Sequence, residues 1–102
     1  SVYLNNNKIT DISALKNAEK LVFLYIQKNQ ITDISSIRNK KKLRYLDISD
    51  NNITNIQVIA TLPNLEYVNL KNNPIDYEHP EVKEVLNQLI DQGCFIEKGL
   101  IK

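Results

Sequence analysis

Aliphatic residues recur along most of the chain in a fixed order and at a fixed spacing. Leu21, Leu43 and Leu65 each begin a segment that carries further aliphatic residues three and five positions later. Val2 and Leu4 occupy the matching positions of an earlier, incomplete copy. The copies are 22 residues apart. A constant period of this size indicates a repeat architecture in which neighbouring units stack side by side.

Each unit divides into two parts. In the first, apolar and polar residues alternate, which predicts a short strand with one face toward the core, and stacking joins these strands into a parallel sheet. In the second, isolated aliphatic residues recur and are expected to line the opposite, convex side. These recurring positions are Ile9, Ile31, Ile53 and Ile75; Ile12, Ile34 and Ile56; and Leu15, Ile37 and Ile59.

The period stops after Ile75, and the pattern becomes that of an amphipathic helix. Pro80 suits the first helical position, His79 can cap it, and Gly93 suits a left-handed stop. We expect a helix over roughly residues 80 to 92, followed by a segment at 94–96 that pairs with or packs beneath the last repeat. The apolar stripe of this helix has i, i+3, i+4, i+7 and i+8 spacing: Val82, Val85, Leu86, Leu89 and Ile90.

These patterns predict one domain with two parts. Residues 1–75 form the repeats, one partial and about three full or nearly full copies, and residues 76–102 form a C-terminal helical cap. No comparable cap is expected at the other end, where the first strand would expose a pairing edge. We expect further repeats to precede Ser1, and we expect the chain alone to associate end to end through this edge.

Residues 1 to about 75 resemble the leucine-rich repeat L-x-x-L-x-L-x-x-N-x-L. The segments Ile9–Leu15 and Ile31–Ile37, which both begin Ile-Thr-Asp-Ile-Ser, are similar to the 22-residue repeats of the bacterial internalin family. The resemblance implies an α/β solenoid: a right-handed superhelix with a parallel concave sheet, short 3-10 or irregular convex segments and a C-terminal capping helix. It further implies a protein ligand on the concave face and favours a bacterial surface or secreted location.

Two other functions stay open beside that one. Phosphatase-regulating repeats of the same length are eukaryotic relatives, so the chain could be an intracellular scaffold or regulatory subunit. A purely structural spacer is the other alternative.

An asparagine follows each predicted strand. A side-chain amide at a strand exit can satisfy backbone groups that the turn leaves unpaired. We therefore interpret these residues as a structural ladder and not as a metal or sugar site: Asn7, Asn29, Asn51 and Asn73.

The strand residues that point away from the core form three columns across the concave sheet. The columns are Ser1, Phe23, Tyr45 and Tyr67; Tyr3, Tyr25, Asp47 and Asn69; and Asn5, Gln27, Ser49 and Lys71. Five of the seven aromatic residues of the chain lie in them. Exposed rings are typical of protein interfaces, but Tyr and Phe also favour strands and stack across them. We predict protein binding by Tyr3, Phe23, Tyr25, Gln27, Tyr45, Asp47, Ser49, Tyr67, Asn69 and Lys71, with Lys28 and Asp50 at the rim.

The net charge of +1 gives no overall reason to expect a nucleic acid or an anionic membrane. The most basic run comprises Arg38, Lys40, Lys41, Lys42 and Arg44. Lys40 stands where the next repeat has Leu62. We expect a solvated rim with the Lys40 stem along the core, and we favour this over an acidic-ligand or nucleic-acid patch.

Residues suited to catalysis are few. His79 and Cys94 are the only histidine and cysteine, and a helix between them would separate them by roughly 18 Å at 1.5 Å per residue. We expect His79 to cap the helix and Cys94 to be buried, with Glu78, Glu81 and Glu84 on a solvated helix face. No apolar run approaches the ~20 residues that span a bilayer. We therefore expect a non-catalytic module with no cofactor, no metal, no nucleic-acid partner and no membrane insertion.

Overall fold

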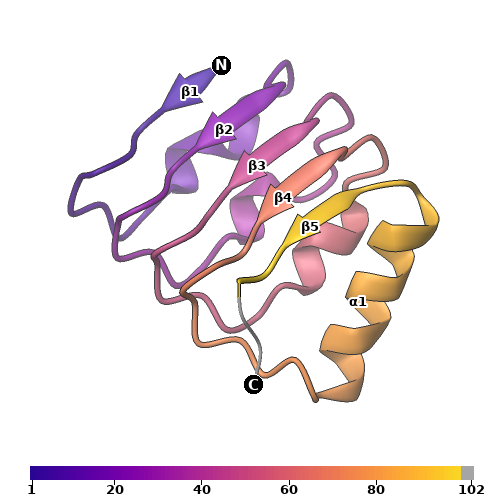
Figure 1. Cartoon of the computed structure of the whole chain (residues 1–102). Coiled ribbons are helices and arrows are strands. Elements are labelled where there is room, and N and C mark those ends of the chain that lie inside the picture. Colours follow the sequence, from indigo (N-terminus) through magenta and orange to yellow (C-terminus); the bar gives the residue numbers. More distant parts are fainter. Residues whose placement is uncertain (100–102) are drawn as a thin grey trace.

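The computed structural model describes residues 1–99, which form one five-stranded parallel sheet in chain order (Figure 1). The strands are β1 (Val2–Tyr3), β2 (Phe23–Tyr25), β3 (Tyr45–Asp47), β4 (Tyr67–Asn69) and β5 (Phe95–Glu97). Each residue of β1, β2 and β3 pairs with the residue 22 positions later on the next strand, as Leu24 does with Leu46. The predicted side-by-side stacking of the 22-residue units is therefore confirmed.

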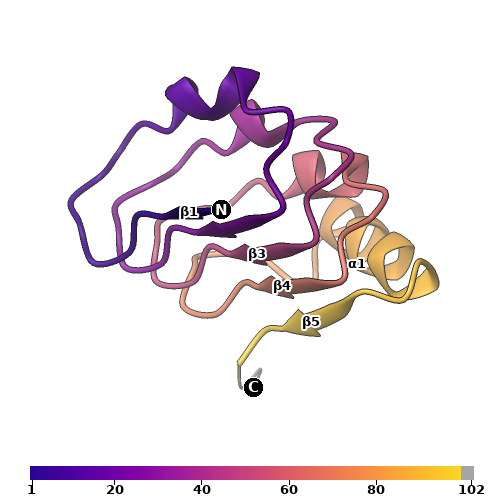
Figure 2. The ribbon, with the colours of Figure 1, turned by 90° about the horizontal axis from the view of Figure 1, so that it is seen from above.

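Three short 3-10 helices lie on the side opposite the strands, as Figure 2 shows. They are η1 (Ser13–Asn17), η2 (Ser35–Ile37) and η3 (Gln57–Thr61), and each packs on the next. They confirm the short convex segments expected from the sequence.

The core fills the space between the sheet and the convex segments. Its central layer consists of the inward strand residues Leu24, Leu46 and Val68, all 0% exposed. The matching Val2 of the first unit is only partly buried, because in residues 1–99 nothing packs on the outer side of β1. Burial therefore increases from the first repeat toward the middle ones.

Each strand ends in a turn that contains one left-handed residue. Asn6, Lys28, Asp50 and Asn72 have φ between 56° and 62° and are spaced one repeat apart. Asn and Asp tolerate this conformation better than other residues with a side chain, which explains three of the four. Lys28 is the exception.

The capping helix α1 (Pro80–Asp91) packs against η3 and β5. The His79 side chain caps it, because its Nδ1 accepts a hydrogen bond from the Glu81 amide at 3.1 Å. Gly93 has φ +85° just beyond the helix end. Pro80 and Gly93 thus have the predicted positions, and the segment 94–96 pairs with the last repeat through β5.

The prediction that Ile90 belongs to the buried apolar stripe of α1 is wrong. Val82, Val85, Leu86 and Leu89 are buried, whereas Ile90 is 60% exposed. With 3.6 residues per turn, Ile90 is rotated about 80° from Val82 around the helix axis. The i+8 position therefore falls outside the buried face.

Lys40 also differs from the expectation of a solvated rim. Its whole side chain is buried, at 1% exposure. Its ammonium donates to the carbonyl oxygens of Lys16 at 3.3 Å and Ala18 at 3.2 Å, at the end of η1. Carbonyl oxygens at the C-terminal end of a helix attract cations, and through these two bonds Lys40 joins two neighbouring repeats.

Candidate protein-binding face

The concave face of the sheet carries a row of aromatic rings, one from each of four strands. We call Phe23, Tyr45, Tyr67 and Phe95 the aromatic column; they are in register across β2 to β5. Phe23 and Tyr45 stack with centroids 4.9 Å apart and an interplanar angle of 5°. Tyr67 and Phe95 are also nearly parallel, at 6.0 Å and 8°.

The stacking is interrupted in the middle of the column. The Tyr45 and Tyr67 rings are 6.4 Å apart and tilted by 39°. Because paired strands are about 4.8 Å apart, these two rings diverge from each other above the sheet. The column thus consists of two stacked groups with a break between β3 and β4.

A second column runs beside the first and changes from aromatic to acidic. It contains Tyr3, Tyr25, Asp47, Asn69 and Glu97, in register from β1 to β5. The Tyr3 and Tyr25 rings stack at 4.9 Å, and Tyr3 is 66% exposed. The N-terminal half of the face is therefore aromatic across both columns.

The carboxylates of Asp47 and Glu97 give the C-terminal half of the concave face negative character. Partial burial, followed by the charges of Glu97 and Asp47, raises the pKa of the Tyr67 hydroxyl above its usual value. Burial is also the main cause of a raised pKa at Tyr25, where the neighbouring Tyr3, Tyr45 and Asp47 groups add to the effect. Both phenols therefore remain protonated at neutral pH and can donate hydrogen bonds.

Some of the residues that the sequence predicted for this face are not accessible to a partner. Ser49 is 5% exposed and Asn69 is 9% exposed, because short side chains lie below the larger neighbours on adjacent strands. Gln27 is half-buried, and its Oε1 has no hydrogen-bond partner within residues 1–99. Tyr3, Phe23, Tyr25, Tyr45, Tyr67, Asp47 and Lys71 remain at least partly exposed.

The sequence columns missed Phe95 and Glu97, which extend the first two columns onto β5. Phe95 is 59% exposed, and Glu97 forms an ion pair with Lys71 at 3.9 Å. The sequence feature that could have revealed them is the segment Phe95-Ile96-Glu97. It has the same polar and apolar order as Tyr67-Val68-Asn69 but follows that segment by 28 residues instead of 22. The helix α1 accounts for the longer spacing.

The asparagines at the strand exits bind backbone groups of two neighbouring repeats. Asn51 donates through Nδ2 to the carbonyl oxygens of Ile26, Ile48 and Ser49, and its Oδ1 accepts from the Ile31 amide at 3.1 Å. Asn29 and Asn73 repeat this arrangement. Asn7 is exposed and donates only to carbonyls of its own turn.

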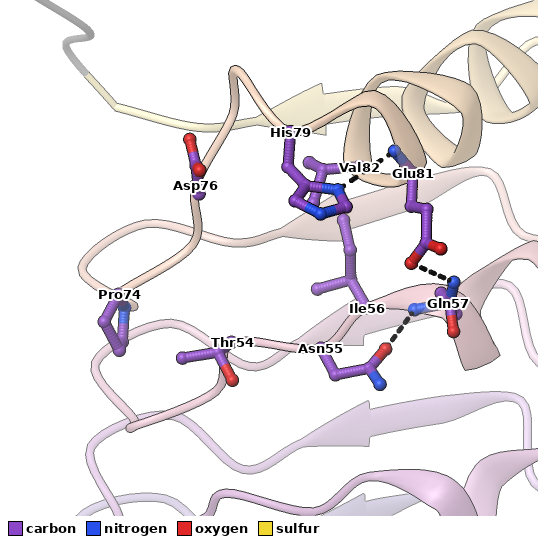
Figure 3. Close-up of a pocket in the computed structure, with 9 residues that line it drawn as sticks. All are labelled: Thr54, Asn55, Ile56, Gln57, Pro74, Asp76, His79, Glu81 and Val82. Carbon is purple, nitrogen blue, oxygen red and sulfur yellow. Dashed lines mark hydrogen bonds between the residues drawn. The ribbon is translucent and has the colours of Figure 1, made fainter.

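A hollow of about 380 Å³ lies away from this face, between the last repeat and the start of α1 (Figure 3). Its polar groups are bonded to one another: Gln57 Nε2 donates to Glu81 Oε2 at 2.7 Å, and the Glu81 amide donates to His79 Nδ1. Ile56 and Val82 supply an apolar floor. The hollow is therefore a seam between repeat and cap that the Gln57–Glu81 hydrogen bond crosses.

His79 and Cys94, the only histidine and cysteine, both have structural roles. His79 caps α1, and Cys94 is buried at 7% exposure. Burial raises the pKa of the Cys94 thiol to about 11, so the thiol is protonated and a poor nucleophile at neutral pH. Within residues 1–99, no group of three or more His, Cys, Asp or Glu side chains could hold a metal ion. The same residues include no helix with the length and apolar character needed to cross a bilayer.

The chain is similar to known repeat proteins. A family model described as leucine-rich repeats matches residues 1–39 and 41–79. Internalin C2 of Listeria monocytogenes is 33% identical with a TM-score of 0.81, and the match covers 95% of this chain and 40% of that one. A second internalin of that species, InlF, is 26% identical with a TM-score of 0.64 over 89% of this chain and 32% of that one. The search of curated proteins gave no match.

These matches agree with the internal evidence. The 22-residue register of the parallel sheet agrees with a match to a leucine-rich repeat model, and the TM-score of 0.81 shows that the internalin C2 structure has the same fold over 95% of this chain. The fold is in general that of a protein-interaction module. The chain belongs to the leucine-rich repeat family, with repeats of the internalin type.

Proposed function

We propose that this chain is a protein-recognition module that holds a protein ligand against the concave face of its sheet. The observation that carries the proposal is the position of the aromatic residues. Six of the chain's seven rings lie on the outward face of the strands, where Tyr3 and Phe95 are exposed and the other four are partly exposed. Exposed Tyr and Phe side chains supply contact area at low entropic cost and are enriched where proteins bind each other.

The charges around the rings support the same role. Asp47, Glu97 and Lys71 lie on the same side of the sheet as the rings, and Lys28 and Asp50 lie at the strand exits. Such mixed charges orient a partner and set the association rate more than they add affinity. We propose further that the module is part of a longer surface or secreted bacterial protein, because the similar internalins are more than twice as long as this chain.

A structural spacer is the second candidate. The parallel stacking of Phe23 on Tyr45 and of Tyr3 on Tyr25 favours it, since rings on adjacent strands stabilise the sheet when they stack. A spacer would need the rings for stability only. The two functions therefore differ in whether loss of the rings affects binding or unfolding.

Capture of a protein ligand by the immobilised chain distinguishes a recognition module from a structural spacer. A Phe23→Ala/Tyr45→Ala/Tyr67→Ala variant is compared with a convex-side control, Lys16→Ala/Arg38→Ala/Gln57→Ala, whose residues are all exposed. Concave-face recognition predicts that the first variant loses a captured protein while its circular dichroism spectrum stays native, and that the control retains it. Equal capture by both variants would contradict concave-face binding and favour the spacer.

A further inference from the structure

The break in the aromatic column lies directly beside an acidic side chain. Tyr45 and Asp47 are two residues apart on β3 and share the concave face, as Tyr67 and Asn69 do on β4. The diverging pair of rings, tilted by 39° with centroids 6.4 Å apart, is therefore the neighbour of Asp47 along the concave face. Tyr25 is in register with Asp47 on the other side.

Asp47 is held in place by its own strand exit. Its Oδ1 accepts hydrogen bonds from the amide of Ser49 at 3.0 Å and from the Ser49 hydroxyl at 2.6 Å. Both bonds use the same oxygen, and no donor in residues 1–99 contacts Oδ2. The side chain thus presents one fixed, unused carboxylate oxygen to the concave side.

The neighbouring charges leave Asp47 without a counter-charge. Glu97, the other acid of the second column, is paired with Lys71 at 3.9 Å. Arg44, the residue just before β3, is paired with Glu66 at 3.4 Å. Within the described chain no Lys or Arg nitrogen lies within 4.0 Å of the Asp47 carboxylate. The unmatched charge on this part of the face is negative.

We propose that the concave face binds an arginine side chain of its protein partner between Tyr45 and Tyr67, with the guanidinium paired to Oδ2 of Asp47. This inference rests on the proposed function and names the chemistry of its central contact. A guanidinium is planar, stacks on tyrosine rings and donates to carboxylates. A lysine ammonium is more strongly hydrated and cannot stack in the same way.

The chain supplies its own isosteric control for this site. Asn69 occupies the position of Asp47 in the next repeat, and its Oδ1 accepts from the Lys71 amide at 3.1 Å. Asp47→Asn should therefore keep the hydrogen bonds to Ser49 and remove only the charge. The matched control is Asp33→Asn, because Asp33 is an exposed aspartate before η2 whose Oδ1 accepts from the Ser35 amide at 2.8 Å, as Asp47 does from Ser49.

The test is an NMR titration of the chain with two peptides, acetyl-Leu-Arg-Leu-amide and the same peptide with neutral citrulline. We expect the arginine peptide to shift the amide signals of Tyr45, Asp47 and Tyr67, and to bind about fivefold more tightly than the citrulline peptide, the size expected of an exposed cation–π contact with a surface ion pair. Asp47→Asn should abolish that preference, and Asp33→Asn should preserve it.

Equal binding of the two peptides, binding by neither, or a preference that survives Asp47→Asn would overturn the proposal. A lysine peptide that binds as tightly as the arginine peptide would overturn the choice of arginine. These results are separate from the capture experiment. If capture depends on the aromatic column while the peptides show no preference, the module binds protein without an arginine contact at Asp47.

Discussion

The ammonium nitrogen of Lys40 lies 3.2 Å from the carbonyl oxygen of Ala18, inside the molecule and one repeat away along the chain. Ala18, Lys40 and Leu62 occupy the same position in successive repeats. The small Ala18 leaves room for the lysine stem, and the end of η1 supplies the acceptors. A long cation thus fills a position that an aliphatic residue fills in the following repeat.

This arrangement predicts different effects for two substitutions of Lys40. Lys40→Ala removes the stem and leaves a cavity, and we expect it to lower the free energy of unfolding by about 2–4 kcal/mol. Lys40→Met keeps most of the stem and removes a buried charge, so we expect a change within about 1 kcal/mol. Urea unfolding measures both, with the exposed Lys41→Ala as control. A Met variant as unstable as the Ala variant would show that the ammonium bonds, and not the stem, stabilise this site.

Lys40 also illustrates which features the sequence could not reveal. The repeat period, strand register and convex segments follow from aliphatic spacing alone, because each unit must bury the same positions. The environment of Lys40 depends on two carbonyls contributed by the preceding repeat, and hydropathy assigns a lysine to the surface. Phe95 was missed from the aromatic column for a related reason, since β5 enters the sheet after a helix and outside the 22-residue period.

The asparagine at the third strand exit should be essential to stability. Asn51→Ala leaves the Ile31 amide without its side-chain acceptor in a buried turn, whereas the carbonyl oxygens of Ile26 and Ile48 still accept hydrogen bonds from Asn29 and Asn73. An unsatisfied buried group costs about 1–3 kcal/mol, so we expect a loss of this size in urea unfolding. Asn7→Ala is the comparison, because Asn7 is exposed and bonds only its own turn. If the two variants lose equal stability, the bonds between repeats are not the source of the effect.

Cys94 should be unreactive in the folded protein, and its ionisation should couple to stability at high pH. Its folded pKa of about 11 exceeds the ordinary 9.0. The thiol is neutral in both states below pH 9, so folding is unaffected there; as pH rises from about 9 to about 11, only the unfolded state ionises and stability falls. We expect iodoacetamide at pH 8 to label Cys94 in urea and not in the native protein. A Cys94→Ala variant should lose less stability than the native protein across the same pH range, and rapid native labelling would contradict the buried position.

The edge of β1 predicts self-association of the 102-residue chain in isolation. No strand in residues 1–99 pairs with the outer side of β1, and Val2, Leu4 and Ile9 are only partly buried, whereas Leu24, Ile26 and Ile31 one repeat later are 0% exposed. An unpaired strand edge above an incompletely covered core favours pairing with another chain. We therefore expect sedimentation velocity to detect concentration-dependent association.

A lysine introduced at this edge should weaken the association, because a charge on an edge strand opposes pairing. Val2→Lys is the variant, and Phe95→Lys is its control, since Phe95 is exposed on the same sheet but in the last strand. Association through β1 and the concave face of a second copy would respond to both variants, whereas association between two β1 edges would respond to Val2→Lys alone. A chain that sediments as a monomer at all concentrations would show that the partly buried residues of the first repeat do not suffice to bind a second copy.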